Sequence, residues 1–255
     1  MRSRILYEDR DIIVCHKPAG IATQTARVGQ RDMVSEITAY LAKEIKGNFS
    51  EKGRKPAGQA PYVGVVHRLD QPVEGILVFA RNKAAAAGLS RQITEERVEK
   101  DYYAVVCGQE IPAEGELTDY LLKDGRTNLS KVVPKEMKGA KEARLRFHVL
   151  QYKELEISEG RLCRTALIKI RLQTGRHHQI RVQMANAGLS LLGDHKYADE
   201  EAVRLSEQMG IREIALCAGR LAFHHPLTGE KKVFSVMPEG KAFIAFGQAI
   251  AQDSI

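Results

Sequence analysis

A guanidinium and a carboxylate lie two residues apart in the segment His67-Arg68-Leu69-Asp70, which stands between two apolar runs. In an extended segment residues i and i+2 point to the same side, so Arg68 and Asp70 can form an ion pair or hold one ligand together. Charged loops between strands often carry chemistry on a fixed scaffold. The alternative is a turn aspartate ahead of Pro72 that caps backbone N–H groups, with Arg68 in a surface salt bridge.

Two further segments contain residues that could act with such a carboxylate. Tyr102 and Tyr103 are adjacent in a predicted strand, so one ring should pack in the core while the other faces a pocket; both can also be sheet packing. In Thr174-Gly175-Arg176-His177-His178-Gln179-Ile180-Arg181, Gly175 permits a tight turn into a helix expected over 177–187. Arg181 lies beside the apolar stripe of that helix, which shelters its head group, whereas Arg176 and His177 are better placed for a phosphate backbone or solvent.

The overall charge favours an anionic partner. The 255 residues carry a net charge of +7 and are 44% hydrophobic, so a packed core is expected, as one large domain or two small ones. The alternative is a basic protein without such a partner. A Gly- and Pro-rich basic segment over 47–61 reads as a loop, and Lys52, Arg54 and Lys55 in it could contact phosphates or simply be solvated.

Neither a metal site nor a membrane segment is predicted. The four cysteines are far apart, and adjacent histidines on a helix point about 100° apart, which suits one metal ion poorly. The N-terminus is acidic where a signal peptide is apolar, and no apolar run approaches the ~20 residues that span a bilayer. We therefore expect a cytoplasmic protein with reduced cysteines.

Short strands in hairpins with a few helices between them predict an α+β fold with a mixed, mostly antiparallel sheet and flanking helices. Asn82 is a plausible N-cap of one of these helices. The expected strands are 4–7, 12–16, 76–80, 99–107, 115–122, 130–134, 140–152, 161–173, 216–225 and 232–237, and the expected helices are 33–46, 82–96, 177–187 and 240–251.

Three motifs in this order, H-R-L-D at 67–70, K-x-Y-x-A at 100–104 and T-G-R-x-H-Q-I-R at 174–181, resemble those of the RluA-type pseudouridine synthases, which isomerise uridine within RNA. The resemblance implies the catalytic fold of that family, with Asp70 as the catalytic carboxylate and Tyr102 in the site. It also implies that Arg181 pairs with Asp70, and that Arg68 reaches into the RNA to hold the target nucleotide out of the stack. Val73-Glu74 departs from the family, which has a hydroxyl residue before the glycine.

The implied reaction breaks the N1–C1′ bond of a uridine, rotates the base and rejoins it through C5, without a metal ion or cofactor. Asp70 would attack C1′ or remove the proton at C2′, and the sequence leaves both open. A single carboxylate suits an isomerisation better than a hydrolysis, which usually employs a carboxylate pair.

We expect one catalytic domain over 1–255 without a separate N-terminal RNA-binding domain, acting as a monomer on ribosomal or transfer RNA. Asp194 is expected to be a structural turn residue. The competing interpretations are a non-catalytic RNA-binding or ribosome-assembly protein on the same scaffold, and a metal-dependent hydrolase.

Overall fold

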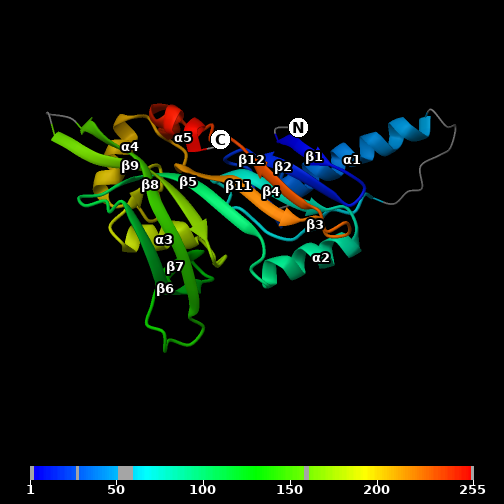
Figure 1. Cartoon of the computed structure of the whole chain (residues 1–255), viewed down its shortest axis with the longest axis horizontal. Helices are drawn as coiled ribbons and strands as arrows, with labels where there is room; N and C mark the ends of the chain where they lie inside the picture. The colour runs from blue at the N-terminus through cyan, green and yellow to red at the C-terminus, as the bar shows by residue number, and fades with distance from the viewer. Residues whose placement is uncertain (1–2, 27–28, 51–59, 158–160, 254–255) are drawn as a thin grey trace. The chain divides into compact units, whose positions relative to one another are not determined.

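The computed structural model describes residues 3–26, 29–50, 60–157 and 161–253, and the chain divides into two compact units (Figure 1). Unit 1 comprises Met1–Val98 and Leu221–Val236, and unit 2 comprises Glu99–Arg220 and Met237–Ile255. Strand β11 (Leu216–His224) carries the chain from unit 2 back into unit 1. Within the described ranges, no helix combines the length and the apolar composition needed to cross a membrane.

Unit 1 is built on antiparallel strands, with β2 (Ile12–Lys17) paired to β1 (Arg4–Glu8) and to β4 (Glu74–Ala80). Every residue of β2 and β4 is buried, as expected for apolar runs in the interior of a sheet. The short β3 (Gly64–Val65) also pairs with β4, and β12 (Lys231–Ser235) pairs with β11. The strands predicted at 4–7, 12–16, 76–80, 216–225 and 232–237 are therefore confirmed.

The helices of unit 1 begin at side-chain caps. α1 (Met33–Ser50) follows Asp32, whose Oδ1 accepts from the N–H of Ser35 at 2.7 Å. α2 (Lys83–Thr94) follows Asn82, whose Oδ1 accepts from the N–H of Ala85 at 2.9 Å, so the predicted cap is confirmed. α1 continues to Ser50, so residues 47–50 of the predicted loop are helical, and residues 51–59 lie outside the described ranges.

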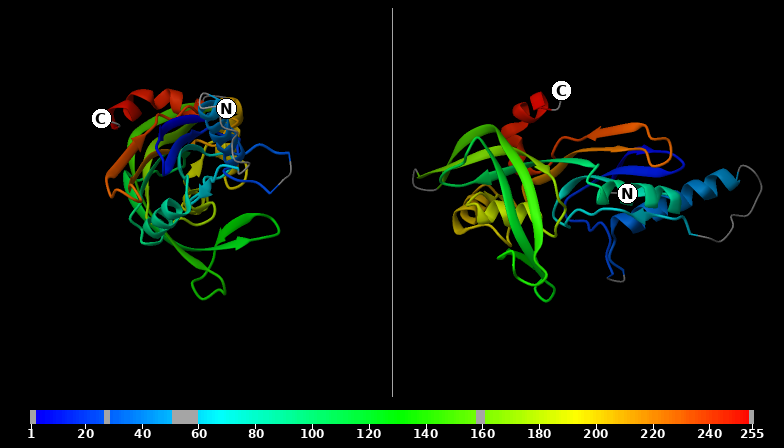
Figure 2. Two further views of the ribbon diagram at one scale, coloured as in Figure 1. Left: turned by 90° about the vertical axis from the view of Figure 1, so that its right-hand side faces the viewer. Right: turned by 60° about the horizontal axis from the view of Figure 1, so that its bottom comes forward.

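Unit 2 is built on a longer antiparallel sheet (Figure 2). Its strand order is β5-β9-β8-β6-β7, and β10 (Ser190–Leu191) pairs with β5. β10 was not predicted, whereas β5 has its predicted bounds and the ends of the other four strands lie no more than five residues from their predicted positions. The bounds are β5 (Glu99–Cys107), β6 (Glu114–Asp124), β7 (Leu129–Val132), β8 (Lys141–Ile157) and β9 (Arg161–Leu172).

Strand register assigns the two neighbouring tyrosines of β5 to opposite faces of this sheet. Tyr102 is opposite Ile170 of β9. Its side of the sheet is the one that α3 (Gln179–Asn186) covers, where Val182 of α3 packs against Ala143 of β8. Tyr103 points to the other face, where its hydroxyl donates to Asp253 of α5 (Gly247–Asp253) at 2.7 Å.

Three helical segments differ from expectation. α3 begins two residues later than predicted, because His178 precedes it in the left-handed region with φ of 54°. The predicted helix 240–251 is a 3-10 helix, η2 (Lys241–Phe246), followed by α5. α4 (Glu200–Gln208), capped by Asp199, was not predicted. The α+β class with a mostly antiparallel sheet and flanking helices is confirmed.

Candidate active site

Asp70 lies in a loop of unit 1 whose main chain is bonded on both sides of this residue. Before it, the N–H of Leu69 donates to Thr23 Oγ1 at 3.1 Å, and the same hydroxyl donates to the Leu69 carbonyl at 3.0 Å. The N–H of Val73 donates to the Asp70 carbonyl at 3.1 Å and closes a turn. The Asp70 side chain is half-buried, so a fixed backbone presents a partly sheltered carboxylate.

Lys17 bonds the residue that follows Asp70. Its side chain is fully buried, and Nζ donates to the carbonyls of Pro18 at 3.0 Å, Ile21 at 2.7 Å and Gln71 at 3.0 Å. Burial lowers the pKa of Lys17 to about 7, against the opposing effect of the negative charges of Asp70 and Glu74. Three carbonyl acceptors also favour the ammonium, because only that form has three N–H donors.

The other residues of the first motif take the places that the alternation predicts. Arg68 is exposed and Leu69 is buried, so Arg68 points away from the core. His67 Nε2 accepts from the N–H of Val78 in β4 at 3.1 Å, which gives this imidazole a structural role. Glu74 is buried at the start of β4, with Oε2 3.8 Å from His16 Nε2, so the departure from the family motif is a packed strand residue.

Tyr102 of unit 2 is 7% exposed, and both of its chain neighbours are bonded on the opposite face of the sheet. Arg171 binds the Asp101 carboxylate with Nε and with Nη2, the latter at 2.9 Å, and Arg220 Nη1 lies 3.3 Å from the same group. The Tyr103 hydroxyl is held by Asp253. Tyr102 therefore stands on a segment of backbone that has little freedom to shift.

Arg181 forms a buried bidentate ion pair with Asp194 in unit 2. Nε and Nη2 lie 2.8 and 2.6 Å from the two carboxylate oxygens, and the two side chains are 4% and 1% exposed. The expectation that Arg181 is sheltered is confirmed, whereas the description of Asp194 as a turn residue was incomplete. Asp194 does stabilise a turn, since Oδ1 accepts from Lys196 N–H at 2.9 Å, but it also holds the guanidinium. Pairing of Arg181 with Asp70 stays a prediction.

The predicted RNA-contacting residues fall into three groups. Arg176 is exposed, and its Nε donates to the Glu142 carbonyl at 2.7 Å. His177 is half-buried; its Nδ1 lies 2.9 Å from Ser130 Oγ and its ring stacks on His178 at 3.7 Å, so it is less directed to solvent than expected. Lys52, Arg54 and Lys55 lie outside the described residues.

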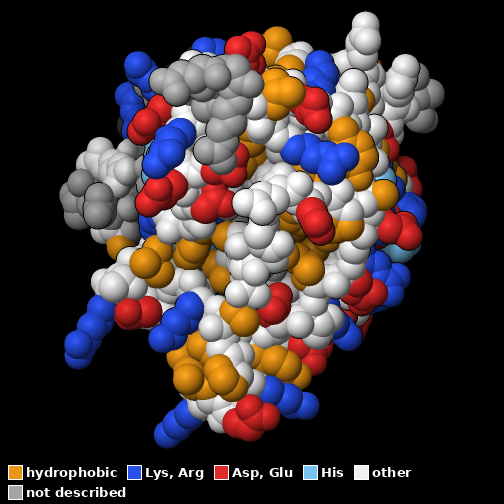
Figure 3. Space-filling model, turned by 90° about the vertical axis from the view of Figure 1, so that its left-hand side faces the viewer, with side chains coloured by type: hydrophobic (Ala, Val, Ile, Leu, Met, Phe, Trp, Pro, Cys, Tyr) orange, Lys and Arg blue, Asp and Glu red, His pale blue; other side chains and the backbone are white. Residues whose placement is uncertain are grey.

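Unit 2 contains a second basic segment, which was not predicted from the sequence. The hairpin of β6 and β7 and the turn after it, residues 121–140, form what we call the basic hairpin. It ends in exposed Lys and Arg side chains beside apolar surface (Figure 3). The exposed basic residues are Lys123, Arg126, Lys131, Lys135 and Lys138. They could have been found by counting charges over the predicted strands and the turns between them together.

A cleft of about 690 Å³ lies in unit 2, lined by Asp101 and Arg171, among others. Its positive groups are paired with carboxylates: Arg171 with Asp101, Arg146 Nε with Glu116 at 2.9 Å, and Lys169 with Asp253 at 2.7 Å. A cleft with balanced charges provides little attraction for a polyanion.

Asp9, Asp11 and His225 of unit 1 have ligand atoms within 4.8 Å of one another. A metal ion fits this cluster poorly. His225 Nδ1 accepts from the N–H of Thr228 at 3.1 Å, so the ring proton belongs on Nε2, which lies 3.1 Å from Asp9 Oδ2. A protonated Nε2 cannot coordinate a cation.

The cysteine thiols are also poor candidates for chemistry. All four are buried. Burial raises the pKa of Cys15 to about 12 and raises the pKa of Cys107 as well, so both remain uncharged thiols at neutral pH.

Comparison with known proteins connects this geometry to a family. A model of the RNA pseudouridylate synthase family matches residues 11–186. The chain is 31% identical over 253 residues to a tRNA pseudouridine synthase C of Haemophilus ducreyi, covering 97% of this chain and 96% of that protein. It is 30% identical to a ribosomal large subunit pseudouridine synthase D of Zymomonas mobilis, over 92% of this chain and 69% of that protein. The solved structure of human RNA pseudouridylate synthase domain containing 4 shares the fold, with a TM-score of 0.67 at 21% identity over 98% of this chain and 92% of that one.

Proposed function

The chain belongs to the RluA-type family of RNA pseudouridine synthases, and we propose that it isomerises specific uridines of transfer or ribosomal RNA with Asp70 as the catalytic carboxylate. The observation that carries the assignment is the bonding of the Asp70 loop. Leu69 and Gln71 are held by Thr23 and Lys17, so the backbone that carries the carboxylate is fixed on both sides. Catalytic groups need this kind of pre-organisation.

The reaction is an isomerisation, so its atoms balance without a co-reactant. The N1–C1′ bond breaks, the uracil rotates, C5 bonds to C1′, the C5 proton leaves and N1 gains a proton. Asp70 acts either as a nucleophile at C1′ or as a base at C2′, and both roles need the ionised carboxylate. An arginine close to a carboxylate lowers its pKa, which is the role that we propose for Arg181 toward Asp70.

Tyr102 is proposed to contact the everted uracil with its ring and to place its hydroxyl near the proton that moves. Its position on a strand anchored through Asp101 and Tyr103 supports this role, because a stacking platform is effective when its backbone is fixed. Eversion costs a few kcal/mol, which contacts to the protein must offset. Arg68, exposed beside Asp70, is the proposed residue for holding the nucleotide out of the stack.

The RNA backbone is proposed to lie against Arg176, His177 and the segment that contains Lys52, Arg54 and Lys55, in keeping with the net charge of +7. We propose that both units contribute to one catalytic domain, which would act as a monomer and select its target itself. The cytoplasmic location remains a proposal from the sequence.

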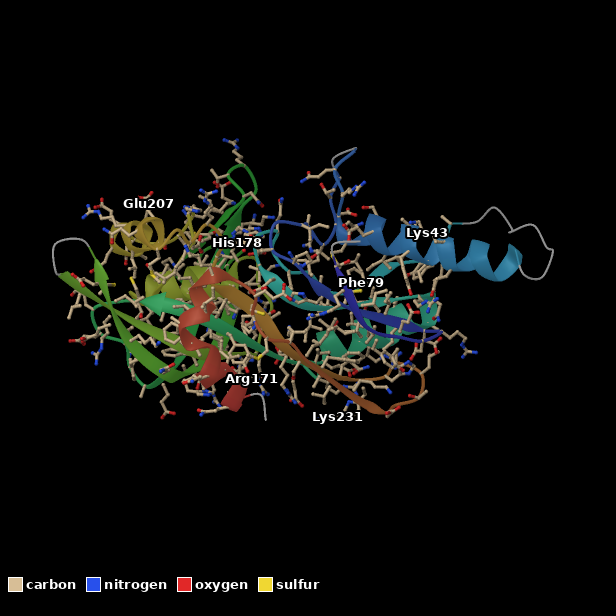
Figure 4. The ribbon with its side chains drawn as sticks, turned by 90° about the horizontal axis from the view of Figure 1, so that it is seen from above. Lys43, Phe79, Arg171, His178, Glu207 and Lys231 are labelled. Carbon is tan, nitrogen blue, oxygen red and sulfur yellow. The ribbon has the colours of Figure 1, made fainter. Side chains whose placement is uncertain are left out.

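The test is a map of pseudouridine across total RNA from cells with and without this gene, and from cells that express variants. Cells that lack the gene should lose one or a few sites, which the wild-type gene restores and Asp70→Asn does not, although Asp70→Asn binds RNA within a few fold of wild type. Glu207→Gln, which alters an exposed carboxylate of α4, is the control and should restore the sites (Figure 4). Restoration by Asp70→Asn would overturn the assignment.

A further inference from the structure

Tyr197 joins three elements of unit 2 around Arg181. Its ring lies 5.1 Å from the Arg181 guanidinium carbon, and Asp194 holds the same guanidinium with two bonds. The Tyr197 hydroxyl accepts from the Ser130 N–H of β7 at 2.9 Å and lies 2.7 Å from His178 Nδ1. One aromatic side chain therefore contacts the cation, the residue that precedes α3 and the edge strand.

The ring of Tyr197 also belongs to the apolar contact between the basic hairpin and α3. Leu121 and Val132 of the hairpin pack with Val182 of α3, and Tyr197 packs against this cluster. Packing orients the ring, while the hydroxyl has bonding partners on both sides. A rotation of the ring would therefore disturb the hairpin, the start of α3 and the guanidinium together.

A second connection runs parallel to the first. Ser130 Oγ lies 2.9 Å from His177 Nδ1, and the His177 ring stacks on the His178 ring. His178 is 8% exposed and adopts a left-handed backbone conformation that is uncommon for residues other than glycine. A residue in such a conformation persists when its surroundings determine it, and here those surroundings are Tyr197, His177 and, through them, β7.

We propose that Tyr197 is a positioning residue that couples the docking of the basic hairpin to the orientation of Arg181. Docking of β7 fixes the Tyr197 hydroxyl, the fixed ring supports the guanidinium, and Asp194 completes the arrangement. With the hairpin undocked, Arg181 keeps its counter-ion but loses the surface that sets its angle. The effect on turnover rests on the proposed function, in which Arg181 serves Asp70, whereas the coupling itself does not.

The test compares Tyr197→Phe with Tyr152→Phe. The first variant removes the Tyr197 hydroxyl, which contacts Ser130 and His178, and keeps the ring. The control removes the hydroxyl of Tyr152, a β8 residue of the same unit, which donates to the Ile111 carbonyl at 3.1 Å. Amide hydrogen exchange of residues 129–132 reports docking, the Nε–H resonance of Arg181 reports its orientation, and kcat and KM on RNA report function.

Tyr197→Phe should accelerate exchange at Ser130 about tenfold, since a backbone donor loses its partner, and should shift or broaden the Arg181 Nε–H signal. It should lower kcat about tenfold while KM changes less than about threefold, because the orientation of a group and not the binding surface is altered. Ser130→Ala, which cuts only the parallel connection, should change each readout in the same direction by less. Tyr152→Phe should change none.

Unchanged exchange and an unchanged Arg181 signal in Tyr197→Phe would overturn the coupling, whatever the enzyme does. Accelerated exchange with an unchanged Arg181 signal would also overturn it, by reducing Tyr197 to a support for the hairpin. Full activity of Asp70→Asn would instead remove the proposed function, and the exchange and resonance measurements would still decide the coupling.

Discussion

The Asp70 loop of unit 1 and the Arg181 site of unit 2 are stabilised in different ways. Around Asp70, side chains bond the main chain of the neighbouring residues, through Thr23 and Lys17. Around Arg181, side chains contact the guanidinium itself, through Asp194 and Tyr197. The first arrangement fixes the backbone on both sides of the carboxylate, whereas the second fixes the guanidinium directly.

This difference predicts that substitutions have different consequences in the two regions. Replacing the carboxylate partner of Arg181 leaves a buried charge without its counter-ion, and the protein should lose stability. Replacing a partner of the Asp70 backbone releases a loop, and the cost appears as lost order near the carboxylate. The following predictions test this comparison, from the largest expected effect to the smallest.

Asp194→Asn should destabilise unit 2 by about 3–5 kcal/mol, because the buried Arg181 guanidinium keeps its charge and loses its counter-ion. Chemical denaturation measures the loss. The matched control is Glu116→Gln, which breaks the exposed pair of Glu116 Oε2 with Arg146 Nε at 2.9 Å and should cost less than about 1 kcal/mol. Equal losses for the two variants would mean that the Arg181–Asp194 pair is not desolvated.

Lys17→Met should destabilise unit 1 by about 3 kcal/mol, because three carbonyls lose their donor while the methionine fills a similar volume. The loss should be accompanied by faster amide exchange in residues 69–73, which reports the release of the Asp70 loop. Lys43→Met, on an exposed position of α1 (Figure 4), should change stability by no more than about 0.5 kcal/mol. A destabilised Lys17→Met with unchanged exchange in the loop would contradict the role of Lys17 in holding Gln71.

The contrast between the regions also explains what the sequence could predict. The strands, α2 and its Asn82 cap depend on residues close in the chain, and alternation alone placed Tyr102 and Tyr103 on opposite faces. Contacts across long separations were not readable: Lys17 and Gln71 are 54 residues apart, and Arg181 and Asp194 are 13 apart. A lysine at the end of an apolar strand was a signal for a buried cation, but nothing local indicated three carbonyl partners.

The start of α3 shows a different limit. Glycine is the residue that usually permits a turn, and Gly175 was therefore expected to make the turn into a helix that begins at residue 177. The backbone instead takes the left-handed conformation at His178, which is bonded to Tyr197 from a segment that follows α3. Local propensity was overridden by a contact that exists only after the unit has folded.

The third prediction concerns pH and tests whether the Arg181 site is the acid-sensitive region of the molecule. Burial lowers the pKa of His178 to about 3 from an ordinary value of 6.5, helped by the positive charges of Arg181 and His177. Below pH 6.5 His178 binds a proton in the unfolded chain but stays neutral in the folded chain, so stability falls as the pH decreases from 6.5 toward 3.

Between pH 7.5 and pH 5 this residue should account for about 2 kcal/mol of lost stability, measured by denaturation at each pH. His178→Asn should remove that part of the slope, because asparagine tolerates the left-handed conformation and does not titrate. His195→Asn, at an exposed position in the same unit, should keep it. An unaltered slope in His178→Asn would mean that the imidazole is protonated in the folded state. The Arg181 site would then contain two adjacent positive charges, which its contacts with Tyr197 and Asp194 give no reason to expect.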